Sequence, residues 1–129
     1  MLTKNTAPNS QEKVWLKTVA EFHNEYGLGY LYGAEWNSSP FQIHHVCGRA
    51  YKQNKVKIGN WFILCVPISL HDVHSNHPLN VTHWRHRFTD DFGLQRDLWL
   101  KMVEKMRSEC VECSFPAHEV ERAIMASKF

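Results

Sequence analysis

The longest apolar run in the chain covers only residues 61–70. A helix that crosses a membrane needs about 20 apolar residues, so this run is too short to span a bilayer. Residues 61–66 have the sequence Trp-Phe-Ile-Leu-Cys-Val, which is typical of a buried strand. The run therefore predicts a buried strand that leads into a turn, and no membrane partner.

A second strand is predicted by alternating apolar and polar residues. Residues 41–46 have the sequence Phe-Gln-Ile-His-His-Val, and Cys47-Gly48 marks the expected end of the strand. Together with residues 61–66, this segment predicts a two-stranded hairpin. The segment 26–40, rich in Gly, Tyr and Ser, predicts turns with room for a short strand.

Helices are predicted on both sides of this hairpin. Asn9 and Glu12 form a capping-box pattern before an apolar stripe at helical spacing. Pro67 is suited to the first turn of a short helix. The expected helices cover 10–25, 68–75, a segment from Asn80 to about Gly93, 95–108, and a last segment from Pro116.

The totals fit one ordinary globular domain. The chain has 129 residues, of which 43% are hydrophobic and 22% charged, so a disordered chain is excluded. We expect an α+β fold in a single domain over 1–129, with a β-hairpin and helix core at about 41–78 and helical flanks at 10–25 and 80–127. The N-terminus has no apolar segment typical of a signal peptide, so we expect a cytoplasmic protein. The net charge of +2 is too small to indicate nucleic-acid binding by itself.

Histidines are concentrated in the middle of the chain. Seven of the nine fall at positions 44, 45, 71, 74, 77, 83 and 86. Neighbouring side chains on a strand point to opposite faces, so His44 and His45 suit different tasks, one as a metal ligand and one as a base. His71 and His74 are three residues apart, so on a helix they can reach one ion.

These residue types match what phosphodiester hydrolysis requires. A histidine can activate water, because its ordinary pKa is near neutrality. A divalent metal can neutralise charge on the phosphate and on the leaving oxygen. The side chain of Asn60, which precedes the second strand, can hold the base in orientation by hydrogen bonds.

At this point the sequence resembles a known family. The segment His-His-Val-Cys-Gly-Arg at 44–49, then Lys-Ile-Gly-Asn-Trp-Phe-Ile-Leu at 57–64, and then His71 resemble the ββα-metal motif of HNH endonucleases. The segments 80–88 and 92–95 are similar to phage and prophage proteins of the recombination-enhancement (Ref-like) type. The resemblance covers about 41–100 and implies a metal-dependent DNA endonuclease, encoded by a phage or prophage and acting in DNA recombination or processing.

The resemblance also implies a role for each matching residue. His44 becomes a metal ligand, His45 the general base, Asn60 the residue that orients the base, and His71 the first metal ligand on the helix. The family commonly places another histidine four residues later, where this chain has Ser75. His74 is the nearest substitute and His77, after the expected helix, is the alternative. A Cys-x-x-Cys pair that many relatives have before the His-His strand is absent here.

The residues leave the identity of the metal open. Imidazole ligands favour zinc, manganese or nickel over magnesium. Asp72 or water could add the oxygen ligands that magnesium prefers. One divalent ion is expected, with Mg²⁺ or Mn²⁺ in use and Zn²⁺ also compatible.

DNA is the expected partner, and a recombination protein is a second candidate. Basic side chains follow the His-His strand and recur near residue 85, and they are expected to contact phosphates. The expected DNA-binding residues are Arg49, Lys52, Lys55, Lys57 and Arg85. The alternative is a non-catalytic, metal-containing module that binds DNA or a recombinase, and a closed site of four protein ligands would favour it.

The cysteines suggest a weaker alternative metal site. Cys110 and Cys113 have the spacing of a zinc knuckle, but no second tight Cys or His pair lies nearby in sequence. Cys47 and Cys65 could join them only if the fold brings all four together. Otherwise the four cysteines are expected to be core residues or to have no specific role.

Overall fold

The fold was analysed in a computed structural model, which describes residues 7–129 and has the α+β architecture expected from the sequence. The main sheet is a two-stranded antiparallel hairpin of β1 (Phe41–His45) and β4 (Ile63–Pro67), and a smaller hairpin lies between them in sequence. The small hairpin comprises β2 (Lys52–Gln53) and β3 (Val56–Lys57). The helices are α1 (Ser10–Tyr26), α2 (Gly29–Tyr32), the 3₁₀ turn η1 (Ala34–Trp36), α3 (Ile68–His71), α4 (Arg85–Phe92), α5 (Gln95–Ser108) and α6 (His118–Met125).

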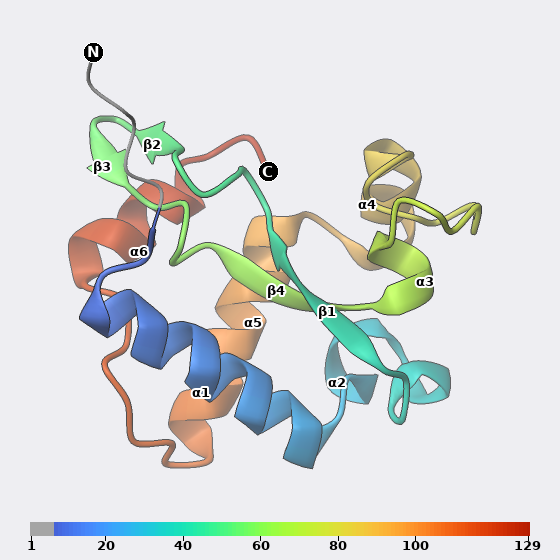
Figure 1. The fold of residues 1–129 in the computed structure, drawn as a ribbon, viewed down its shortest axis with the longest axis horizontal. Coiled ribbons are helices and arrows are strands. Elements are labelled where there is room, and N and C mark those ends of the chain that lie inside the picture. The colour runs from blue at the N-terminus through green and yellow to red at the C-terminus, as the bar shows by residue number, and fades with distance from the viewer. Residues whose placement is uncertain (1–6) are drawn as a thin grey trace.

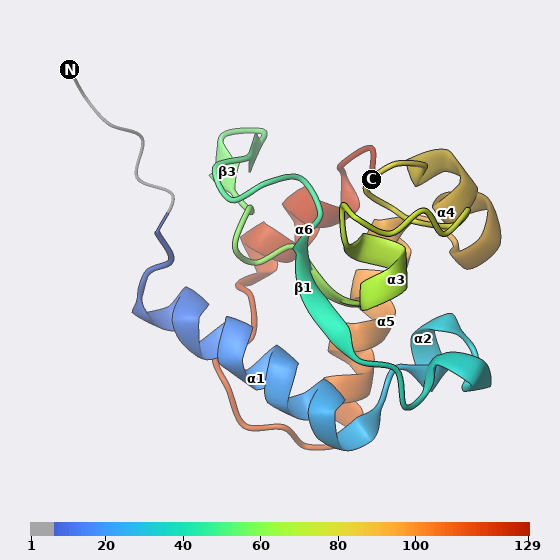
Figure 2. The same cartoon turned by 45° about the vertical axis from the view of Figure 1, so that its right-hand side comes forward.

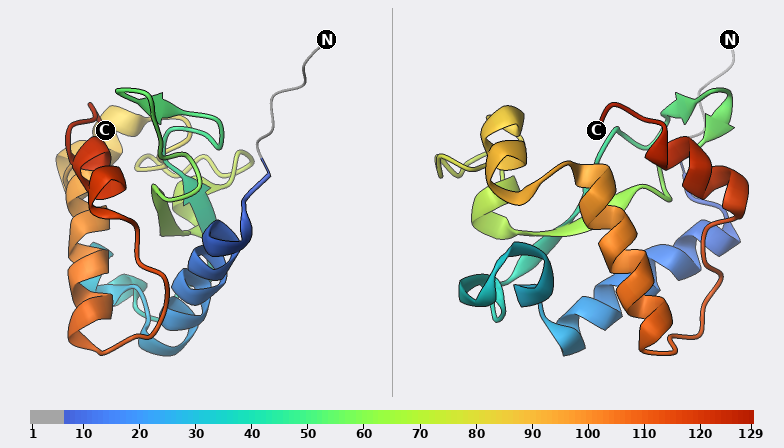
Figure 3. Two further views of the ribbon diagram at one scale, coloured as in Figure 1. Left: turned by 90° about the vertical axis from the view of Figure 1, so that its left-hand side faces the viewer. Right: turned by 180° about the vertical axis from the view of Figure 1, so that it is seen from behind.

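Strand β4 is the centre of the hydrophobic core. All five of its residues are buried, whereas β1 is half-buried along its length. Helices α1 and α5 both pack against β4, and Figure 3 shows α5 crossing behind the hairpin. Within residues 7–129, none of the helices has the length and apolar character needed to cross a membrane.

The start of β4 is attached to both of these helices through one carbonyl group. The indole N–H groups of Trp15 on α1 and Trp99 on α5 each donate a hydrogen bond of 3.0 Å to the backbone oxygen of Trp61. Trp15 and Trp99 are fully buried. An unpaired carbonyl in this position would be costly, because buried polar groups need hydrogen-bond partners. The two bonds therefore fix the residues just before β4 between α1 and α5.

Helices α3 and α4 lie beside the main hairpin. In the antiparallel register, His44 pairs with Leu64 and His45 with Ile63, at the end of β1 that precedes the small hairpin. Helix α3 follows β4 directly and packs against both strands, with α4 on the same side of the molecule (Figures 1 and 2). Side chains of α3 and α4 can therefore meet beside His44.

The structure confirms the helices that were expected at 10–25, at 95–108 and after Pro116. Asn9 and Glu12 exchange the two hydrogen bonds of a capping box, both 2.8 Å, and α1 covers Ser10–Tyr26. Helix α5 begins and ends at the residues expected from the apolar pattern. The last helix begins at His118, two residues after the predicted start.

The predicted helix over 68–75 is wrong, because α3 ends at His71. Asp72 has an extended backbone, with φ −62° and ψ 135°, and its side chain accepts a hydrogen bond from the backbone N–H of His74 at 2.8 Å. The Asn80 amide donates to the backbone oxygens of Ser69 and Asp72, at 3.2 and 3.0 Å. These bonds hold the chain in a turn, where Pro67 had suggested a helix that continues to Ser75.

The predicted helix start at Asn80 is also wrong. The Asn80 side-chain oxygen accepts hydrogen bonds from the backbone N–H groups of Thr82 and His83, which form a turn, and α4 begins only at Arg85. Phe88 is buried as expected.

The strand boundaries differ slightly from the prediction, and the segment 26–40 contains no strand. Gly27, with φ +87°, ends α1, and the segment then forms α2 and η1. Strand β1 ends at His45, before the expected Cys47-Gly48, and β4 begins at Ile63 rather than at residue 61. The loop between the main strands also contains the small hairpin β2–β3, where a basic loop was expected.

The shared carbonyl predicts non-additive effects of tryptophan substitution. We expect Trp15→Phe and Trp99→Phe each to lower the free energy of unfolding by about 1–2 kcal/mol, from one lost hydrogen bond and reduced packing. The double variant should lose about 1 kcal/mol more than the sum, because the Trp61 oxygen then loses both indole donors. Chemical denaturation of the four proteins measures this coupling, and strictly additive losses would contradict it.

Candidate active site at the end of the hairpin

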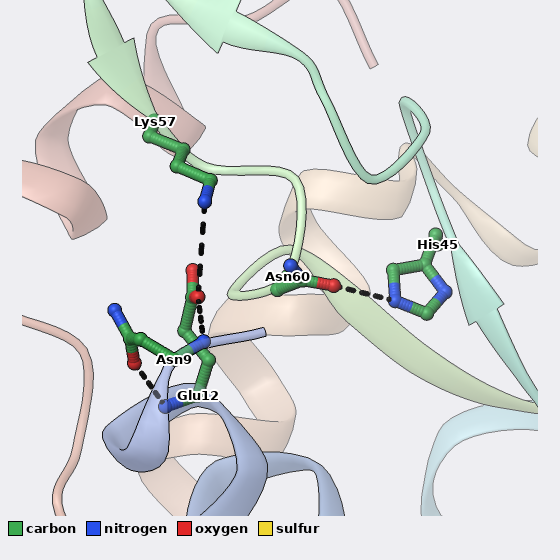
Figure 4. A network of polar contacts seen from close by, with 5 residues as sticks. All are labelled: Asn9, Glu12, His45, Lys57 and Asn60. Carbon is green, nitrogen blue, oxygen red and sulfur yellow. Dashed lines mark hydrogen bonds and ion pairs between the residues drawn. The ribbon is translucent and has the colours of Figure 1, made fainter. Parts of the chain in front are cut away.

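His44 and His45 make separate hydrogen bonds, as expected for neighbours on a strand. The Nε2 of His44 lies 2.9 Å from the side-chain oxygen of Gln95, at the start of α5. The Nε2 of His45 lies 3.1 Å from the side-chain oxygen of Asn60 (Figure 4). An amide oxygen only accepts, so in both pairs the histidine Nε2–H donates. Each ring therefore keeps its Nδ1 as the nitrogen with the free electron pair.

Asn60 is held beside His45 by a close contact between two loops. It is fully buried, in the loop that precedes β4. A Cβ atom on the adjacent Gly59 would lie 2.2 Å from the backbone oxygen of Arg49 and 2.5 Å from that of Gly48. Only glycine allows this approach, because a side chain at position 59 would displace the loop that follows β1. Gly59 therefore places the Asn60 amide next to the His45 ring.

His44 and His71 come together on the other side of the strand. Their ring centroids are 4.9 Å apart, and the rings are tilted by 62°. Both side chains line one open cleft of about 470 Å³. The other residues that line this cleft are Gln42, Val46, Asp72, Val73, Val81, Thr82, Arg85 and Gln95. The hydroxyl of Thr82 donates to the backbone oxygen of His71, which holds the end of α3 in place.

Burial keeps these histidines neutral near pH 7. It lowers the pKa of His44 to about 4, and the nearby His71 contributes further. Burial also lowers the pKa of His45, with smaller contributions from Arg49 and His71, although the bond to Asn60 acts in the opposite direction. The pKa of His71 is lowered by burial as well, against the opposing charge of Asp72. A neutral imidazole is the form that binds a metal or accepts a proton.

The structure does not bring the other expected ligands to this pair. Because α3 ends at His71, His74 does not share a helical face with it, and it lines a separate shallow cavity with His83 and Trp84. The His77 ring packs against Trp36, with centroids 5.9 Å apart, and its Nδ1 accepts a hydrogen bond from the backbone of Leu79.

No larger metal cluster is formed within residues 7–129. No three His, Cys, Asp or Glu side chains of this part of the chain are grouped so that they could hold a metal ion. The four cysteines are free thiols; Cys65 is buried and Cys110 is exposed. The structure thus gives no support to a zinc site at Cys110 and Cys113.

Four of the five expected DNA-binding residues lie at three places on the surface. Arg85 lines the cleft with His44 and His71, and its guanidinium carbon lies 5.3 Å from the centre of the Phe129 ring. Arg49 is exposed in the loop after β1, close enough to affect the pKa of His45. Lys52 and Lys55 are exposed on the small hairpin.

Lys57, by contrast, lies beside a buried carboxylate. Its Nζ is 4.0 Å from the side chain of Glu12, which is 1% exposed (Figure 4). Removing one partner of such a pair leaves a buried charge uncompensated. Lys57 therefore has a structural partner on α1, unlike Lys52 and Lys55.

Sequence reasoning missed two residues that contact the histidines. Gln42 lies two positions before His44, so strand alternation places both on the same face and could have indicated it. Gln95 follows His44 by 51 positions, and no local pattern links the two. Only the packing of α5 behind the hairpin brings Gln95 to the site.

Comparisons with known proteins returned no relative from which a role could be transferred. No family model matches the chain, and neither the curated proteins nor the solved structures gave a match.

The loop contact at Gly59 leads to a prediction about stability. We expect Gly59→Ala to lower the free energy of unfolding by about 2 kcal/mol or more, because the added methyl group overlaps the backbone of the facing loop. Gly93→Ala is the matched control. A Cβ there meets no atom within 4 Å, so only its φ of +96° opposes the substitution. Equal losses in the two variants, measured by chemical denaturation, would contradict the proposed loop contact.

Proposed function

We propose that this protein is a metal-dependent DNA endonuclease of the HNH type, which hydrolyses phosphodiester bonds. The observation that carries the proposal is that the end of one strand bears two different histidine sites. His45 is hydrogen-bonded to the buried Asn60, and His44 lies against His71 in an open cleft. The resemblance of residues 41–100 to HNH endonucleases supports the same assignment, including a phage or prophage role in recombination or DNA processing.

The residues around the cleft fit a divalent metal ion. His44 and His71 are adjacent and neutral, and each has one ring nitrogen outside the hydrogen bonds described here. Imidazole nitrogens suit first-row metals, and a site with few protein ligands leaves positions for water and a phosphate oxygen. When bound, such an ion stabilises negative charge on the phosphate and on the leaving oxygen. His44 and His71 are the residues proposed to hold it.

His45 is proposed to act as the general base. The bond to Asn60 holds the proton on Nε2, so Nδ1 is the atom that accepts a proton from water. The resulting hydroxide attacks phosphorus, and the bond from phosphorus to the leaving oxygen breaks. The leaving oxygen then takes a proton from solvent water, and His45 returns its proton to solvent. The lowered pKa of His45 keeps the ring unprotonated before the reaction. Asn60 is a positioning residue in this scheme.

The cationic side chains favour DNA as the substrate. Arg85 lies in the cleft with His44 and His71, and Arg49 lies on the side of His45. A phosphodiester bound between His45 and the His44–His71 pair would have a guanidinium on each side. Arginine hydrogen-bonds phosphate oxygens in a bidentate geometry, which fixes the orientation of the backbone.

Replacing the proposed base tests the activity. His45→Ala should reduce nicking of supercoiled plasmid DNA, with Mg²⁺ or Mn²⁺ present, by about 10²-fold or more. His118→Ala, an exposed residue of α6, is the control and should cleave at the wild-type rate. Unchanged cleavage by a folded His45→Ala protein would overturn the assignment of His45. Salt-sensitive DNA binding without cleavage by the wild type under any of Mg²⁺, Mn²⁺ and Zn²⁺ would favour the non-catalytic binding module.

Replacing the cleft arginine tests the mode of DNA binding. Arg85→Gln should weaken binding of a DNA duplex and reduce the slope of log affinity against log salt by about 1, because one phosphate contact is lost. The measurement is fluorescence anisotropy in the His45→Ala background, which prevents cleavage. Lys101→Gln removes one exposed charge from α5, outside the cleft, and should leave the slope unchanged. Equal slopes for the two variants would place the DNA elsewhere.

A further inference from the structure

Three of the side chains that line the cleft form a hydrogen-bonded series. The Gln42 amide nitrogen donates to Oδ2 of Asp72 at 3.1 Å, and the Gln42 oxygen lies 2.6 Å from Nδ1 of His71. We propose that this Asp72–Gln42–His71 relay fixes His71 in its Nδ1–H tautomer, so that Nε2 is the atom that binds the metal. The identity of what Nε2 binds rests on the proposed function, whereas the tautomer does not.

The direction of the relay follows from the chemistry of its first member. An ionised carboxylate only accepts hydrogen bonds, so the group of Gln42 that faces Asp72 must be the NH₂. The Gln42 oxygen then faces His71, and an amide oxygen also only accepts. Nδ1 of His71 must therefore hold the proton. An amide alone could adopt two orientations, and a neutral imidazole alone could adopt two tautomers. The carboxylate of Asp72 leaves one orientation for Gln42 and one tautomer for His71.

The carboxylate that sets this direction is itself held in place. Oδ1 of Asp72 accepts a hydrogen bond from the backbone N–H of His74, so Oδ2 remains for Gln42. Asn80 donates to the backbone oxygen of Asp72, and Thr82 to that of His71. The turn that shortens α3 thus also orients the relay.

The neighbouring histidine is held through its opposite nitrogen. His44 donates from Nε2 to Gln95, whereas His71 donates from Nδ1 to Gln42. The two adjacent rings therefore have different free nitrogens, Nδ1 of His44 and Nε2 of His71. Amide and carboxylate partners of this kind orient metal-binding histidines and raise their affinity, and their loss typically costs 10- to 100-fold in metal binding.

The tautomer can be measured without metal or substrate. Long-range ¹H–¹⁵N spectra of histidine-labelled protein in EDTA at pH 7.5 distinguish the two nitrogens of each ring, and a His71→Gln spectrum assigns the His71 signals. We expect wild-type His71 to be protonated on Nδ1. Gln42→Met, which has a similar volume and no acceptor oxygen, should shift the proton toward Nε2. Gln11→Met, an exposed residue of α1, should leave the spectrum of His71 unchanged.

A double substitution restores the relay with its groups exchanged. In Gln42→Glu combined with Asp72→Asn, the new amide donates to the new carboxylate, which accepts from Nδ1 of His71. The net charge stays the same, and the His74 backbone retains an acceptor oxygen. We expect the double variant to recover the Nδ1–H tautomer, which a merely structural role of Gln42 would not produce.

Isothermal titration with Zn²⁺ alone links the tautomer to binding. Gln42→Met should bind Zn²⁺ about 10- to 100-fold more weakly than the wild type, and the double variant should regain most of this loss. A wild-type His71 protonated on Nε2, or an unchanged tautomer in Gln42→Met, would overturn the relay. Equal Zn²⁺ affinity in Gln42→Met would overturn its role in binding. Failure of the nuclease proposal would look different: the wild type would show the expected tautomer but neither bind metal nor cleave DNA.

Discussion

The backbone carbonyl of Trp61 is the point on which the arrangement of the site depends. It accepts indole hydrogen bonds from α1 and α5, two helices far apart in sequence, and so fixes the residues before β4 against both. Asn60 precedes this carbonyl directly, and the backbone N–H of Trp61 donates to Ile58 at 2.9 Å. The loop that carries Asn60 is therefore held on the core side by tryptophans and on the outer side by the close contact at Gly59. These two constraints contribute to holding the Asn60 amide beside His45.

The pleat of β1 turns one adjacent pair of histidines into two different sites. On one side His45 has a buried amide and a nearby guanidinium, and on the other His44 has Gln95 and the ring of His71. Strand geometry separates the two rings, while α3 and α5 supply partners for the second side only. A helix in place of β1 would point consecutive side chains about 100° apart and could not divide them between opposite faces. The hairpin is thus a functional requirement of the proposed chemistry as well as a support for the core.

The sequence was sufficient where local patterns decide the structure. The capping box at Asn9, the apolar spacing of α5 and the alternation in β1 are local features, and the structure contains the two helices and the strand that they predict. The length of α3 could not be predicted, because it depends on hydrogen bonds from Asn80, which lies beyond the helix. The assumed common face of His71 and His74 failed for the same reason. Gln95 could not be found either, because its contact with His44 arises only when α5 packs behind the hairpin.

The distribution of charge explains how the proposed phosphodiester site is compatible with a net charge of only +2. Lys57 is paired with the buried Glu12, so one of the cations expected to contact DNA also offsets an interior charge. The histidines lose their charge through burial, and a neutral imidazole costs less to bury than a carboxylate would. Arg49 and Arg85 remain exposed at the two sides of the strand end. The cationic groups are therefore local, beside neutral histidines, and the proposed phosphate contact would not require a protonated base.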